Sequence, residues 1–115
     1  MDIPDTSSTI LLIAIVQAQD AVNASDDLKH IHTAAFQLPS MGGFLGLRNT
    51  TLLIQSTSLI WHTVIQVLKQ TCKQRIEYTA VLVDATMMAN GPFLAPVAVG
   101  GATIFSIEVE HFEEV

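Results

Sequence analysis

A continuous apolar run, Thr9–Val16, constrains the fold of this chain more than any other segment. Five of its eight residues are β-branched, and the run is far too short to span a bilayer. A short unbroken run of this kind is typical of a strand that is buried on both faces. We therefore expect a strand here, at the centre of a sheet.

Two helices are predicted from apolar residues that recur at helical spacing. The first is expected after Asp20, which is suited to cap it, and the second after the Ser56–Ser58 cluster, which is suited to the same role. Basic residues toward the end of the second helix complement its dipole. The apolar positions are Ala21, Ala24, Leu28 and Ile31 in the first helix, and Ile60, Val64, Val67, Leu68 and Thr71 in the second.

The remaining segments predict further strands and one long loop. The segment 84–96 breaks every periodic pattern with Asn90-Gly91-Pro92 and Pro96, and loops of this length are uncommon without a function. The order of elements is βαββαβ, which predicts an α+β, ferredoxin-like fold: a four-stranded antiparallel sheet with two helices on one face. Residues 1–8 are expected to form a flexible leader and 9–115 a single domain. The further strands are expected at Ala34–Leu38, Thr50–Gln55, Ile76–Val83 and Thr103–Val109.

Composition narrows the classes of partner. Half of the residues are hydrophobic and only 14% are charged, so the sheet face without helices is expected to be buried against sister subunits in a homo-oligomer. The net charge of −6 argues against a nucleic-acid polymer or an anionic membrane as a general partner. Cys72 is the single cysteine, and the acidic start lacks the basic region of a signal peptide. A cytoplasmic location is the simplest expectation.

No set of residues predicts catalysis, a metal site or a bound cofactor. His30 and His32 are two apart at a helix end, where solvated or capping histidines compete with metal binding as the interpretation. Cys72 has basic neighbours in sequence, but no base or oxyanion site accompanies it, which favours a packed helix cysteine. The cluster of Met87, Met88 and Phe93 is either an adaptable partner surface or a contact with a neighbouring subunit.

The segment from Gly42 to Thr51 has two interpretations. The adjacent glycines Gly42 and Gly43 allow positive φ and a close approach of another molecule to the backbone. Phe44 and Asn49 then supply a ring and an amide, which suit a turn that grips a planar, polar ligand. The same order equally suits an ordinary hairpin connection.

Five segments in collinear order resemble the PII-like cyclic di-AMP receptor family over roughly residues 9 to 112. The resemblance implies a homotrimer of ferredoxin-like subunits that acts as a signal receptor, not an enzyme. One cyclic di-AMP molecule is expected in each cleft between neighbouring subunits, and a protein target is expected downstream. The matching segments are Ile13–Asp20, Gly42–Leu45, Asn49–Thr51, Cys72–Arg75 and Val99–Phe105.

The resemblance also assigns site residues. It implies that Gly43, Phe44 and Leu45 wrap an adenine, that Asn49 hydrogen-bonds the nucleotide, and that Phe105 lines the site from the adjacent subunit.

The sequence departs from the family at four positions near this site. Ala34 and Phe36 stand where the family has an Arg and a Thr that contact base or phosphate, Gln55 replaces a Gly, and Glu114 falls near a Gln. A carboxylate at 114 would repel a phosphate. The alternative is therefore a divergent trimer that has lost cyclic di-AMP and acts as a protein-interaction module or binds another small nucleotide.

Overall fold

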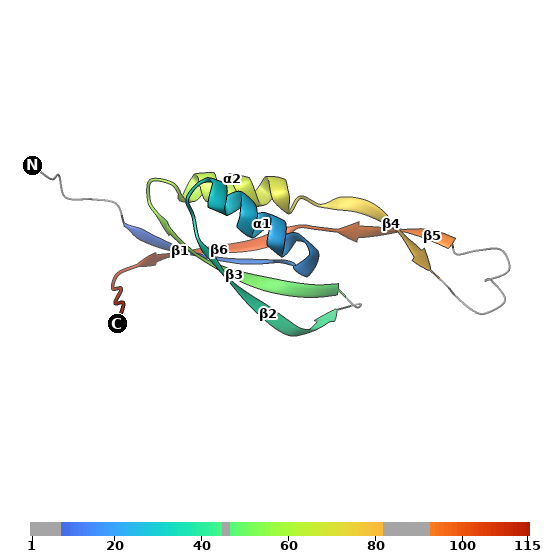
Figure 1. Cartoon of the computed structure of the whole chain (residues 1–115), viewed down its shortest axis with the longest axis horizontal. Helices are drawn as coiled ribbons and strands as arrows, with labels where there is room; N and C mark the ends of the chain where they lie inside the picture. The colour runs from blue at the N-terminus through green and yellow to red at the C-terminus, as the bar shows by residue number, and fades with distance from the viewer. Residues whose placement is uncertain (1–7, 45–46, 82–92) are drawn as a thin grey trace, which may run out of the picture.

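An antiparallel sheet of four strands, in the order β2-β3-β1-β6, carries both long helices on one of its faces (Figure 1). This is the predicted ferredoxin-like α+β arrangement, with the Thr9–Val16 run at the centre as expected. A second, two-stranded sheet is formed by β4 and β5. The elements are β1 (Thr9–Gln17), α1 (Ala18–His30), β2 (Ala35–Phe44), β3 (Leu47–Thr57), α2 (Trp61–Thr71), β4 (Arg75–Val81), β5 (Phe93–Val99) and β6 (Ala102–Val109).

This computed structural model describes residues 8–44, 47–81 and 93–115, and at 40–44, 47, 79–81 and 93 it describes the backbone alone. Within these ranges, no helix has the length and hydrophobicity needed to cross a membrane. The predicted leader 1–8 thus lies outside the described residues except for Ser8, and so do Met87 and Met88.

The core lies between the helices and one face of the sheet. Alternate residues of the central strand β1, namely Leu12, Ala14 and Val16, are almost fully buried there, as the period of two along a strand requires. The buried helical positions that face them follow the predicted periodicity, but Ile60, which was also predicted to lie on this face, precedes α2 and is 39% exposed. The rest of the buried cluster consists of Ala21, Ala24, Leu28, Leu52, Ile54, Val64, Leu68 and Cys72.

Both predicted helix caps are wrong. Helix α1 begins at Ala18 with Gln17 as its N-cap residue, so Asp20 lies inside the first turn, where its side chain is committed to an ion pair described below. Helix α2 begins at Trp61, because β3 continues to Thr57 and takes up two residues of the hydroxyl cluster. Neither helix has a side-chain hydrogen bond at its N-cap.

The prediction for the segment after α2 also needs correction. Strand β4 pairs with β5 in a separate ribbon, which we call the arm, and the fourth strand of the main sheet is β6. The predicted loop 84–96 overlaps β5 at its last four residues, while 82–92 lie outside the described residues. Pro96 favours a loop in the sequence, but a two-stranded ribbon has free edges, where a residue without an N–H is tolerated.

Candidate functional site

The sheet face opposite the helices is exposed and apolar. The register places Phe36, Leu53, Ile13 and Phe105 in one row across all four strands. Phe36 is 72% exposed and Phe105 is 53% exposed, and the neighbouring Ile107 and Leu38 are exposed as well. Burying side chains of this size is worth about 1.5–3 kcal/mol each. A face with such a row is typical of a surface that another protein covers.

Four of the predicted site residues share this face. Asn49 and Gln55 lie on β3 at alternate positions with Leu53, and Phe36 and Phe105 belong to the row itself. All four are exposed. These four residues do not enclose a pocket within one chain. A ligand that contacts all of them would therefore need another surface to cover its exposed side.

The glycine segment forms the connection between two paired strands. Gly43 is the backbone partner of Arg48, and Phe44 that of Leu47, so the hairpin interpretation is correct for the backbone. The register shifts between Pro39 and Gly43, which lets β2 run to Phe44 instead of ending near Leu38. Leu45 lies outside the described residues, and the side chain of Phe44 is not described.

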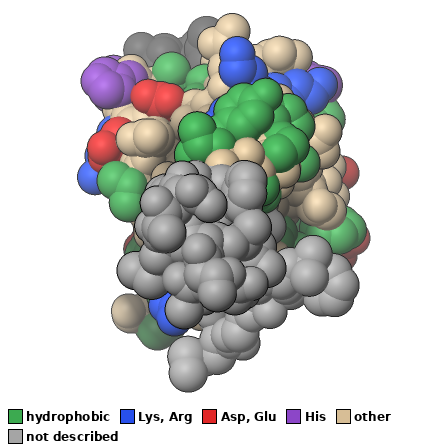
Figure 2. Space-filling view, turned by 90° about the vertical axis from the view of Figure 1, so that its right-hand side faces the viewer, with side chains coloured by type: hydrophobic (Ala, Val, Ile, Leu, Met, Phe, Trp, Pro, Cys, Tyr) green, Lys and Arg blue, Asp and Glu red, His purple; other side chains and the backbone are tan. Residues whose placement is uncertain are grey.

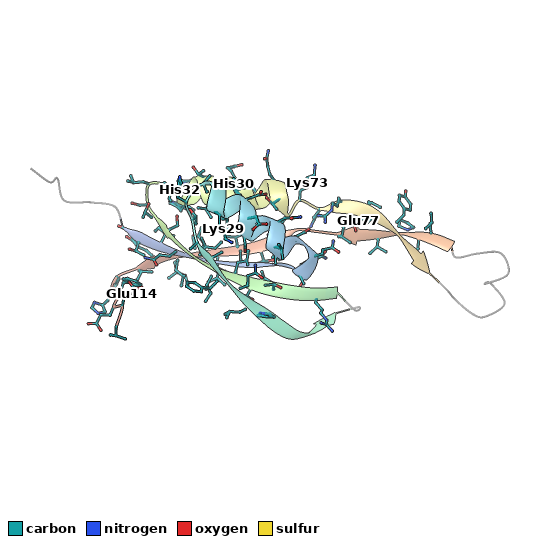
Figure 3. All side chains as sticks on the ribbon, viewed as in Figure 1. Lys29, His30, His32, Lys73, Glu77 and Glu114 are labelled. Atoms are coloured by element: carbon teal, nitrogen blue, oxygen red, sulfur yellow. The ribbon has the colours of Figure 1, made fainter. Side chains whose placement is uncertain are left out.

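Glu114 and the glycine segment belong to opposite ends of the sheet. Strand β6 ends at Val109, which is the register partner of Thr9, whereas Asn49 is the partner of Gln17 at the other end of β1. Figure 3 shows Glu114 in the tail, far from the connection between β2 and β3. Within one subunit, the carboxylate of Glu114 therefore cannot act on a ligand held at the glycine segment. Ala34 precedes β2 and is exposed.

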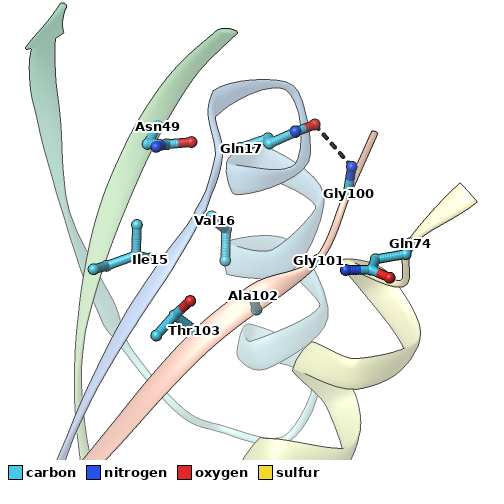
Figure 4. Close-up of a pocket in the computed structure, with 9 residues that line it drawn as sticks. All are labelled: Ile15, Val16, Gln17, Asn49, Gln74, Gly100, Gly101, Ala102 and Thr103. Atoms are coloured by element: carbon cyan, nitrogen blue, oxygen red, sulfur yellow. Dashed lines mark hydrogen bonds between the residues drawn. The ribbon is translucent and has the colours of Figure 1, made fainter. Parts of the chain in front are cut away.

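A hollow of about 240 Å³ opens beside Asn49, at the end of β1 (Figure 4). Gln17 spans one side of it, and its Oε1 accepts a hydrogen bond from the Gly100 N–H at 2.8 Å. Four of the five collinear segments of the sequence contribute to its lining. The lining residues are Ile15, Val16, Gln17, Asn49, Gln74, Gly100, Gly101, Ala102 and Thr103. We call this hollow the Asn49 cavity.

The arm leaves the body next to this cavity, at a junction held by ionic and backbone contacts. Arg75 donates to both carboxylate oxygens of Asp20, at 2.8 and 3.3 Å, and to Glu77 on the arm at 3.1 Å. Hydrogen bonds to these carboxylates raise the pKa of the Arg75 guanidinium further above its ordinary value. Gly101 donates to the carbonyl of Cys72. We call Arg75, Asp20 and Gly100–Gly101 together the arm junction.

Both glycines of the arm junction have positive φ, at 86° for Gly100 and 90° for Gly101. A Cβ on Gly100 would lie only 2.2 Å from the Lys73 carbonyl oxygen. Glycine is therefore required at 100 by space as well as by backbone conformation.

The face of the arm that points away from Arg75 and Glu77 is apolar. Ile76, Tyr78 and Leu94 are strongly exposed on it, and the register pairs Ile76 with Ala98 and Tyr78 with Pro96. Figure 2 looks at the molecule from this end and shows hydrophobic side chains beside a group of Lys and Arg side chains. The residue pattern alone does not predict this surface, because the expected loop 84–96 includes the first four residues of β5.

Cys72 is a packed helix cysteine, as predicted. It is buried at the end of α2, and burial, with a smaller contribution from the charge of Asp20, raises the pKa of its thiol to about 11. A thiol with this pKa is a poor nucleophile at neutral pH. His30 bonds the carbonyl oxygen of Asp26 and His62 stacks on Trp61. The described residues hold no cluster of three or more His, Cys, Asp or Glu suited to a metal ion.

The chain is similar to a known sequence family and to solved protein structures. The sequence model of a family described as "Cyclic-di-AMP receptor" matches residues 9–115. The crystal structure of a functionally unknown protein from Pediococcus pentosaceus ATCC 25745 is similar, with a TM-score of 0.72 and 33% sequence identity. The similarity covers 94% of this chain and 98% of that one.

Proposed function

This chain belongs to the cyclic-di-AMP receptor family, and we propose that it binds cyclic di-AMP in clefts between the subunits of a cytoplasmic, PII-like homotrimer. It then acts as a signal-transduction protein and not as an enzyme. The segment 84–96 signals to a protein target whether cyclic di-AMP is bound.

The observation that carries this proposal is the position of the described site residues. Asn49, Phe36, Gln55 and Phe105 occupy one exposed sheet face whose central row is apolar. Packing three such faces together removes the row from water and supplies the wall that each set of residues lacks. Phe105 of one subunit then lines a site whose Asn49 belongs to its neighbour. Glu114, which is remote from the glycine segment of its own subunit, also approaches the site of a neighbour.

The chemistry of these groups suits a purine dinucleotide. An exposed aromatic ring offers a face on which a base stacks, and such stacking contributes about 1–3 kcal/mol per base. The side-chain amide of Asn49 can both donate to and accept from a base edge. The backbone N–H groups of the glycine segment are suited to an anion or a base edge.

A second candidate function is favoured by Phe36. Its ring stands where the family has a Thr that contacts the ligand, and its 72% exposure makes it available to a protein as readily as to a base. In that case the trimer works as a protein-interaction module without cyclic di-AMP, or binds another small nucleotide.

Isothermal titration calorimetry with cyclic di-AMP tests the proposal, with ATP, ADP and cyclic AMP as competing candidates. We expect one cyclic di-AMP per subunit and a loss of about tenfold or more in affinity for Asn49→Ala. Gln70→Ala, an exposed substitution on α2, is the matched control and leaves the affinity unchanged. Absence of binding for all four nucleotides would overturn the proposed function and favour the second candidate, a protein-interaction module.

The double variant Ala34→Arg/Phe36→Thr distinguishes a weakened pocket from a lost one. It restores two polar contacts worth about 1–3 kcal/mol each, so we expect affinity for cyclic di-AMP to rise by tenfold or more. A double variant with no measurable binding would show that the rest of the pocket no longer fits the ligand.

A further inference from the structure

Gln17 stands between the Asn49 cavity and the arm. Its side chain lines the cavity, and its Oε1 accepts from the Gly100 N–H at 2.8 Å (Figure 4). Gly100 directly follows β5, so this hydrogen bond joins the end of β1 to one strand of the arm. The bond spans 83 positions in the sequence.

Gly100 has little freedom to move independently of the arm. Its Cα faces the Lys73 carbonyl so closely that a Cβ would lie 2.2 Å from that oxygen and 2.9 Å from Arg75 Nη1. Arg75 also donates to the Lys73 carbonyl, at 3.2 Å, and is fixed to the buried Asp20. A shift of Gly100 is therefore a shift of the whole arm junction, where β4 begins and β5 ends.

The amide nitrogen of Gln17 is available for a ligand. A glutamine amide offers one acceptor oxygen and two N–H donors, and Oε1 is used by Gly100. Over the described ranges 8–44, 47–81 and 93–115, Nε2 of Gln17 makes no hydrogen bond to protein. The groups that would accept from it are a purine ring nitrogen or a phosphate oxygen.

We propose that Gln17 is a positioning residue that relays the binding of a nucleotide to the arm. A nucleotide that reaches the Asn49 cavity accepts a hydrogen bond from Nε2, while Oε1 remains bonded to Gly100. The side chain is then held in one rotamer by bonds at both ends, which favours the conformation with the arm fixed to the body. This inference rests on the proposed function, since it takes the nucleotide to bind on the side of the cleft that Asn49 lines.

Hydrogen exchange measured by mass spectrometry on the full chain tests the relay, with peptides from Arg75–Val81 and Phe93–Val99 as the readout. In the unmodified protein, saturating cyclic di-AMP is expected to slow exchange in both strands by about threefold to tenfold, the equivalent of one net hydrogen bond. Gln17→Ala removes both the acceptor for Gly100 and the donor for the nucleotide. The amide hydrogens of its arm are therefore expected to exchange faster, and the exchange rate is not expected to change when cyclic di-AMP is added. Gln17→Glu keeps the acceptor for Gly100 but loses the donors, so its arm is held without ligand and does not respond to it.

Gln70→Ala is the matched control, because Gln70 is an exposed glutamine on α2 and does not line the Asn49 cavity. Its arm is expected to respond to cyclic di-AMP as the unmodified protein does. Thermal melting of each variant separates loss of the relay from loss of folding.

Two results would overturn the relay: unchanged arm exchange in ligand-free Gln17→Ala, or a normal ligand response in that variant. Calorimetry on the same samples separates this outcome from failure of the proposed function. If cyclic di-AMP does not bind, the proposed function fails and the ligand response fails with it, while the ligand-free comparison of Gln17→Ala with Gln17→Glu still decides whether Gln17 holds the arm.

Discussion

Arg75 Nη2 lies 2.8 Å from Oδ1 of Asp20, and this contact joins the first turn of α1 to the first residue of β4. The Asp20 side chain is 5% exposed and the Arg75 side chain is 30% exposed, so the anion is the buried member of the pair. A buried carboxylate needs a partner of opposite charge or hydrogen-bond donors to remain ionised. The arm therefore begins at a residue whose side chain is required by the core of the body.

Asp20→Asn is expected to lower the free energy of unfolding by about 1–3 kcal/mol, because it removes a charge-assisted bond while keeping the shape of the side chain. Urea titration followed by circular dichroism measures the change. The double variant Asp20→Asn/Arg75→Gln should lose less than the sum of its two single variants, since the pair is broken only once. Additive losses would contradict a direct coupling of the two side chains.

Gly100→Ala and Gly101→Ala are expected to differ in severity although both residues have positive φ. Alanine in this conformation costs about 1–2 kcal/mol at either position. At 100 the new methyl group also meets the Lys73 carbonyl at 2.2 Å, whereas at 101 it meets the flexible side chain of Gln74 at 3.2 Å. We expect the first variant to be less stable by at least ~1 kcal/mol more than the second, as measured by chemical unfolding. Equal free energies of unfolding for the two variants would argue against the tight contact at 100.

The thiol of Cys72 predicts a loss of stability at high pH. Its pKa is about 11 in the folded protein against an ordinary value of 9.0, so between these pH values the unfolded chain loses a proton that the folded chain keeps. The contribution is complete below pH 9 and disappears as the pH rises through 11. The stability advantage over Cys72→Ala is expected to shrink across this window in urea titrations.

Alkylation gives an independent check on the same thiol. At pH 8 the folded protein should hold about a hundredfold less thiolate than an unfolded chain, so iodoacetamide should label it slowly until urea is added. Rapid labelling of the folded protein would contradict the burial of Cys72.

Phe105→Asp is expected to disrupt the homo-oligomer, because it places a charge in the apolar row beside Ile13. Size-exclusion chromatography with light scattering should give the mass of a trimer for the unmodified protein and a smaller species for the variant. Val22→Asp is the matched control, since Val22 is 60% exposed on α1, which lies on the opposite side of the sheet. Its mass should remain that of the trimer.

The fold could be predicted from the sequence because its strongest signals are local. The apolar run of β1 and the 3.6-residue period of α2 each report the burial of one element, and the order of elements then restricts the topology. Strand β5 was missed for a local reason as well, since Pro96 and the nearby Asn90-Gly91-Pro92 are typical of loops. The capping role assigned to Asp20 failed because its partner, Arg75, lies 55 positions away.

The candidate site was predicted in part. Asn49 and Phe105 were assigned by resemblance, and the register places them on the same face of the sheet. Gln17 lies in a segment that matches the family, but the sequence predicts no role for it. Its hydrogen bond to Gly100 forms only because the sheet brings the end of β1 beside the start of β6. Residue spacing along the chain does not predict a contact of this kind.

The two strands of the arm start and finish at register partners, Arg75 and Val99. A segment whose ends are neighbours can be lengthened, shortened or exchanged during evolution without moving the strands of the main sheet. Relatives of this protein can therefore differ freely between these two residues while they retain the same body. In such a lineage, the surface presented by the arm diversifies independently of the face that holds Asn49 and Phe105.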